Sequence, residues 1–87
     1  MTVLFYGSVR DHTGGQKQIE ILEAPKTLRL LIDRLAIDFG ESFGEYLIGD
    51  ETCFFLVGGK SVISIGGLDA PLNGDEKIEI IPVVSGG

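Results

Sequence analysis

The chain has 87 residues, of which 44% are hydrophobic, and a formal net charge of −6 at pH 7. This length predicts one domain with one modest core, and the negative charge argues against binding to nucleic acid and favours docking onto a basic partner surface. No apolar run approaches the roughly 20 residues that span a bilayer, so we expect no binding to membranes. No signal peptide precedes the first strand-like run, and the single Cys53 excludes an internal disulfide framework. We therefore expect a cytoplasmic protein.

The first two predicted strands form a hairpin. Residues 2–6 are a short apolar run rich in strand-forming residues. Residues 7–16 are polar, contain two adjacent glycines and are expected to connect the strands. In residues 17–23, Ile19 and Ile21 alternate with polar neighbours, which is typical of an antiparallel strand with one face on a core.

A helix is predicted next, with Thr27 as its N-cap and Gly40 as the residue that ends it. The apolar residues spaced for one buried face are Leu28, Leu31, Ile32, Leu35 and Phe39. Leu30 and Ile37 lie on the opposite face, either as scattered surface residues or as a second contact surface.

The middle of the chain predicts one strong strand and one weak one. Residues 41–52 are mixed in character and predict a connector with a helical turn packed under the core. Residues 53–57 are continuously apolar, which predicts a strand that is central or apolar on both faces. Residues 61–65 are a short strand candidate. Turns are predicted at Gly58-Gly59 and at Asn73-Gly74.

The chain ends in a strand followed by an apolar tail. Residues 77–81 predict the strand, and Pro82 ends it because proline has no N–H to donate. We expect residues 83–87 to be flexible and to end on Gly86-Gly87 with a free carboxylate. Glycines without a Cβ can enter a narrow channel, which suits a C-terminus used in chemistry. A frayed, glycine-rich end is the alternative.

This order of elements predicts an α+β domain with a mixed sheet of four to five strands and one main helix on one face. The first and last strands are expected in the middle of the sheet. Because side chains alternate, either Leu4 and Tyr6 or Val3 and Phe5 must point to the uncovered face, which marks an interaction surface. The residues predicted to bind a partner are Leu4, Tyr6, Phe54, Leu56, Ile81, Val83 and Val84.

Other chemical sites are not supported by the sequence. The Gly59-Lys60-Ser61 stretch lacks the first glycine of a phosphate-binding loop, because Phe54 stands at that position. Cys53 is expected to be a small buried hydrophobic residue, and a single His12 cannot form a metal site. We therefore expect no metal and no bound cofactor.

Several stretches carry a resemblance to a known family. Residues 67–76 (Gly-Leu-Asp-Ala-Pro-Leu-Asn-Gly-Asp-Glu) precede an apolar strand, Pro82 and the terminal Gly86-Gly87. With the element order and residues 3–10, this pattern resembles the β-grasp sulfur carriers, which are ubiquitin-like proteins. In particular it resembles the small subunit of molybdopterin synthase, the MoaD type. The resemblance covers nearly the whole chain and implies a single β-grasp domain over residues 1–87.

The resemblance also implies a function. An adenylyltransferase of the ubiquitin-activating type would use ATP and magnesium to adenylate the Gly87 carboxylate, and a persulfide donor would then convert it to a thiocarboxylate. The tail, with Gly86, would enter the large subunit of molybdopterin synthase and donate sulfur to cyclic pyranopterin monophosphate. Two carriers would pair with a dimer of large subunits in a heterotetramer. The chain would thus be no enzyme on its own, because the catalytic side chains would belong to its partners.

Two alternatives stay open. One is a carrier of the ThiS type, for thiamine thiazole or another sulfur pathway, which would share the fold and the terminus. The other is a ubiquitin-like binding module that docks by its sheet face and whose tail is chemically inert.

Overall fold

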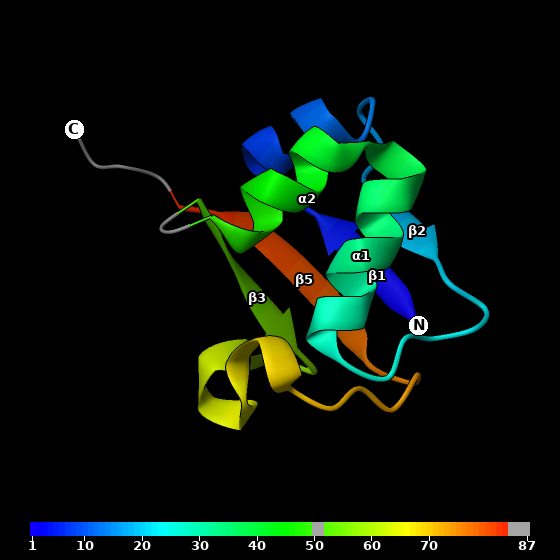
Figure 1. The fold of residues 1–87 in the computed structure, drawn as a ribbon, viewed down its shortest axis with the longest axis vertical. Coiled ribbons are helices and arrows are strands. Elements are labelled where there is room, and N and C mark those ends of the chain that lie inside the picture. The colour runs from blue at the N-terminus through cyan, green and yellow to red at the C-terminus, as the bar shows by residue number, and fades with distance from the viewer. Residues whose placement is uncertain (50–51, 84–87) are drawn as a thin grey trace.

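The computed structural model describes residues 1–49 and 52–83. Its fold is built on one five-stranded sheet (Figure 1). The strands are β1 (Thr2–Phe5), β2 (Gln18–Glu20), β3 (Cys53–Val57), β4 (Lys60–Ser61) and β5 (Lys77–Pro82), in the spatial order β2-β1-β5-β3-β4. Strands β1 and β5 are parallel, and the other neighbours are antiparallel. The prediction that the first and last strands lie inside the sheet is confirmed.

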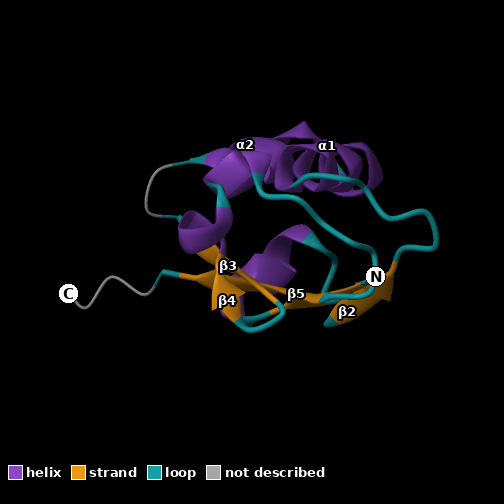
Figure 2. Cartoon of the chain, turned by 90° about the horizontal axis from the view of Figure 1, so that it is seen from below, coloured by secondary structure: helices purple, strands orange, loops and turns teal. Residues whose placement is uncertain are grey.

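Two α-helices lie on the same side of this sheet, α1 (Leu28–Phe39) and α2 (Glu41–Ile48), as Figure 2 shows. The Thr27 hydroxyl accepts a hydrogen bond from the Leu30 backbone N–H at 3.3 Å, as expected of an N-cap. Helix α1 ends at Gly40, whose φ of 112° disfavours any residue with a Cβ. Both predicted ends of the helix are confirmed.

Three segments differ from the prediction. The connector after α1 forms a full helix, because Phe43 and Leu47 are buried one turn apart. Residues 62–65 do not extend a strand: they form the 3-10 helix η2 (Val62–Ile65), which buries Val62 and leaves β4 with two residues. The polar connection after β1 contains a 3-10 helix, η1 (Gly7–His12), that buries Val9. Another 3-10 helix, η3 (Gly67–Asp69), follows η2.

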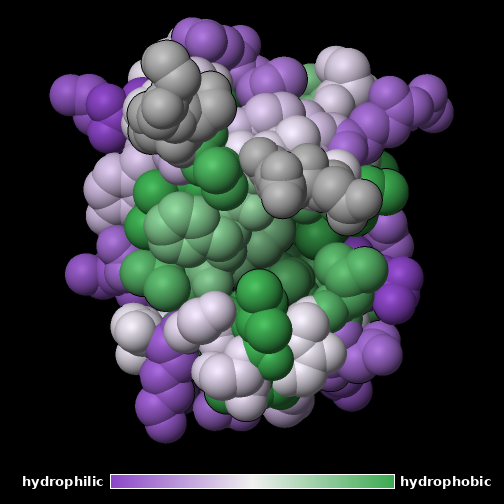
Figure 3. Space-filling view, turned by 90° about the vertical axis from the view of Figure 1, so that its left-hand side faces the viewer, coloured by the Kyte–Doolittle hydropathy of each residue, from purple (hydrophilic) through white to green (hydrophobic). Residues whose placement is uncertain are grey.

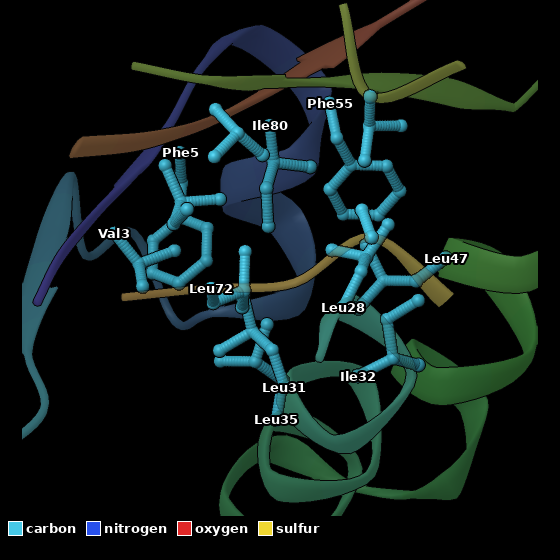
Figure 4. Packing of buried hydrophobic residues seen from close by; sticks show 14 of the residues in the cluster. Val3, Phe5, Leu28, Leu31, Ile32, Leu35, Leu47, Phe55, Leu72 and Ile80 are labelled. Atoms are coloured by element: carbon cyan, nitrogen blue, oxygen red, sulfur yellow. The ribbon is translucent and has the colours of Figure 1, made fainter. Parts of the chain in front are cut away.

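The core lies between the sheet and the helices (Figure 4). Phe5 of β1 is fully buried and meets Phe39 and Phe43 edge to face, with ring centroids 5.8 and 6.0 Å away. The expected buried face of α1 is confirmed for its leucines and Ile32, while Phe39 is only partly buried against the core. Leu30 and Ile37 are exposed, as expected.

The turn before β5 is held by one carboxylate. Glu76 accepts hydrogen bonds from the backbone N–H groups of Asn73 at 2.6 Å and Gly74 at 2.8 Å. Burial, the largest single influence, raises the pKa of Glu76, but the hydrogen bonds from the Asn73, Glu76 and Gly74 backbone together outweigh it and lower the pKa.

Replacing this carboxylate, Glu76→Gln, is expected to destabilise the fold by about 1 kcal/mol at pH 7. Because folding lowers the pKa, the stabilisation is complete above the unfolded value of about 4.3 and disappears as the pH falls through the folded value. Urea unfolding should therefore separate the wild type from the variant at pH 7 and bring them together in acid. Glu23→Gln, an exposed position, is the control. Equal stability of Glu76→Gln and wild type at pH 7 would contradict the expectation.

Candidate functional site

The face of the sheet opposite the helices is built from the outward-pointing residues of three strands. In β5, Ile78 and Ile80 are fully buried, so Glu79 and Ile81 point the other way. No described helix covers that face in Figure 2. The register places Ile81 opposite Phe54. The open face is therefore a continuous surface across the middle of the sheet.

Alternation resolves the choice that the sequence left open. Val3 and Phe5 are fully buried, so Leu4 points to the open face, and Tyr6 follows at the end of the strand. In β3 the same alternation leaves Phe54 41% exposed. We call five of the predicted partner-binding residues the open-face patch: Leu4, Tyr6, Phe54, Leu56 and Ile81. Their binding role stays a prediction.

The end of β5 lies at the rim of this patch. Pro82 pairs with Cys53, and the Val83 N–H donates to the Thr52 carbonyl at 3.1 Å. Gly7 lies against the Pro82 ring, where an added Cβ would come within 2.9 Å of a ring carbon. Apolar side chains gather at this end of the molecule in Figure 3. The described part of the chain therefore stops beside the open-face patch.

The remaining predicted site residues divide into two groups. Val83 is 44% exposed beside the end of β5. Val84, Gly86 and Gly87 lie outside the described residues.

One residue of the open face was not singled out from the sequence. Glu79 lies at the centre of the face and accepts a hydrogen bond from the Tyr6 hydroxyl at 2.8 Å. This hydrogen bond is the main reason that the pKa of Tyr6 is raised; burial and the Glu79 charge add to it, and Arg10 opposes it. The only signal in the sequence is one acid between apolar residues of the last strand.

Cys53 and His12, the single cysteine and the single histidine of the sequence, both pack against neighbouring residues. Burial raises the pKa of the Cys53 thiol, which is half-buried beside the Leu47 carbonyl. The His12 ring stacks on Phe43 and lies tilted against Tyr46, with centroids 5.3 and 4.5 Å away. In residues 1–49 and 52–83 no group of three His, Cys, Asp or Glu side chains could hold a metal ion. No helix in the same part of the chain has the length and apolar character to cross a membrane.

The model of the ThiS family matches residues 3–87. No curated protein sequence matches the chain. Among solved structures, CysO of Mycobacterium tuberculosis, described as an antigen, is 26% identical, with 95% of this chain and 98% of that chain covered and a TM-score of 0.82. A chain in the structure of the BexX/CysO complex of Amycolatopsis orientalis is 28% identical, with 99% of this chain and 98% of that chain covered and a TM-score of 0.81.

A third similar solved structure carries a name linked to molybdopterin. A putative molybdopterin converting factor, subunit 1, from Pyrococcus furiosus is 23% identical, with 95% of each chain covered and a TM-score of 0.67. This likeness supports the fold alone. Together the structural matches confirm the predicted β-grasp, ubiquitin-like fold.

Proposed function

Because this chain belongs to the ThiS family of ubiquitin-like sulfur carriers, we propose that it carries sulfur on Gly87 for the synthesis of molybdopterin. The observation that carries the proposal is that the family match extends through residue 87 and so includes the terminal Gly-Gly. The pattern of residues 67–76, Pro82 and the terminus favours the molybdopterin pathway within the family.

The chemistry begins with a poor electrophile. A carboxylate resists substitution because an oxide is too basic to leave. An adenylyltransferase partner uses ATP and magnesium to join the Gly87 carboxylate to AMP, releasing pyrophosphate. A persulfide sulfur then attacks the carbonyl carbon and AMP leaves. A thiol cleaves the resulting S–S bond, forming a disulfide and leaving a thiocarboxylate on Gly87.

The chain's own contribution is docking and presentation. The open-face patch is apolar at its rim and adjoins the point where β5 ends, so a partner that covers the patch also receives the tail. The large subunit of molybdopterin synthase would then take sulfur from Gly87 into cyclic pyranopterin monophosphate. The reacting side chains belong to the partner, and this chain supplies the sulfur.

The test is the intact mass of the protein after incubation with ATP, a sulfur donor and a lysate of its own source. We expect a gain equal to sulfur replacing oxygen, located on Gly87 by fragmentation and absent without ATP. No gain, with a working adenylyltransferase shown to be present, would leave only an inert binding module.

A second candidate is a carrier for another sulfur acceptor. It is favoured by the two CysO structures, which are 26% and 28% identical to this chain and superpose with TM-scores of 0.82 and 0.81, against 0.67 for the molybdopterin-related protein. The loaded carrier distinguishes the two. Loss of its sulfur to cyclic pyranopterin monophosphate in the presence of the large subunit supports the molybdopterin pathway, and retention of the sulfur supports the other acceptor.

A further inference from the structure

Glu79 occupies an unusual place for a charged side chain. It lies in β5, the middle strand, with Leu4 of β1 and Leu56 of β3 as its paired neighbours on either side. Cross-strand neighbours have Cβ atoms about 5 Å apart. Because Ile78 and Ile80 point into the core, Glu79 points outward. A carboxylate therefore stands at the centre of the open-face patch.

This carboxylate is only partly satisfied within the described chain. An ionised carboxylate offers about four acceptor positions, and the structure shows one of them used, by the Tyr6 hydroxyl at 2.8 Å. The ion pairs among residues 1–49 and 52–83 involve other acids: Arg29 with Asp69, and Arg34 with Asp38. Lys77 stands two residues earlier on the same strand face but makes no ion pair with Glu79 in that part of the chain.

Covering the patch removes water from this carboxylate. A buried charge without a partner is strongly unfavourable, whereas one that meets a cation with good geometry is tolerated. An arginine suits the position better than a lysine, because its guanidinium is weakly hydrated, bonds a carboxylate through two N–H groups and stacks on an aromatic ring such as that of Tyr6. A second copy of this chain would cover the open-face patch poorly, because it would bring a second unpaired Glu79 carboxylate into the same buried interface.

We propose that Glu79 determines which partner this carrier accepts, by requiring an arginine at the centre of the partner surface that covers the open-face patch. The inference rests on the proposed function, and the partner surface it concerns is that of the large subunit of molybdopterin synthase. A surface with an apolar residue at that point buries an unpaired carboxylate and is rejected, which is a common origin of specificity between related partners.

The experiment measures the affinity of the full-length carrier for the purified large subunit from the same source. Glu79→Gln keeps the shape of the side chain and an acceptor for Tyr6, so the fold is retained. We expect the affinity of this variant to fall by about 30-fold or more, because one member of a buried charge pair is lost. Glu20→Gln is the matched control: Glu20 is exposed on the edge strand β2, where it accepts from Thr2, and we expect a change within about twofold.

A double-mutant cycle identifies the cation. Each arginine on the contacting face of the large subunit is replaced by leucine. One replacement should weaken binding to the wild-type carrier strongly and weaken binding to Glu79→Gln little further, because the two changes remove the same interaction.

Two results would overturn the inference, and they are distinguishable from failure of the proposed function. If Glu79→Gln binds like the wild type while Phe54→Asp loses binding, the open face docks without a cation at its centre. If the wild-type carrier does not bind the large subunit, the inference fails together with the molybdopterin assignment. The sulfur gain at Gly87 does not involve the large subunit, so it tests the carrier function independently.

Discussion

Deleting Gly87 is expected to abolish sulfur loading while the domain stays folded. The deletion moves the terminal carboxylate back by one residue, which is about 3.5 Å in an extended chain. A displacement of only about 1 Å from the reactive geometry can reduce a rate about 100-fold, so a loss of at least that size should follow. The measurement is the rate of ATP-dependent mass gain, compared with that of the wild type.

Two companion measurements make this result specific. A chain extended by one alanine after Gly87 keeps every native residue and should fail equally, because its carboxylate is no longer on the terminal glycine. Urea unfolding curves of both variants should coincide with that of the wild type, because the described core does not include the last residues. Normal loading of the shortened chain would refute the proposed carrier chemistry.

Phe5→Ala is expected to have the largest effect on stability, a loss of about 3–5 kcal/mol. Phe5 is fully buried and touches the rings of Phe39 and Phe43, so its removal opens a cavity between the sheet and both helices. Small domains have a total stability of about 5–15 kcal/mol, so the variant has little margin against unfolding. Chemical denaturation followed by circular dichroism measures the loss.

The matched control is the same substitution on the other side of the sheet. Phe54 is 41% exposed on the open face, so we expect Phe54→Ala to cost less than about 1.5 kcal/mol, because much of its ring is already in water. Equal destabilisation by the two substitutions would mean that the open face is packed against something in the isolated protein.

Local signals in the sequence predict much of this fold. Thr27 and Gly40 mark the ends of α1 because each satisfies a requirement of the backbone at its own position. The apolar runs of the first and last strands predict their places inside the sheet, because an edge strand would leave such runs uncovered.

Features that depend on distant contacts are harder to predict. Helix α2 is stabilised by tertiary packing: Gly44 faces Ala36 so closely that an added Cβ would lie 2.8 Å from the alanine methyl. Residues 62–65 have strand-forming composition, yet burial of Val62 favours a 3-10 helix. The bond between Tyr6 and Glu79 joins residues 73 positions apart, which no local pattern indicates.

The parallel pairing of β1 with β5 has a consequence for how the protein is made. Strand β5 joins β1 to β3, so without it the sheet separates into two small hairpins, each too small to be stable alone. During synthesis the core therefore cannot form until β5 has been made. A chain that is terminated before β5 lacks both the fold and the terminal glycines. Correct folding therefore requires a chain that extends through β5, so a partner that recognises the folded sheet does not bind chains that end before it.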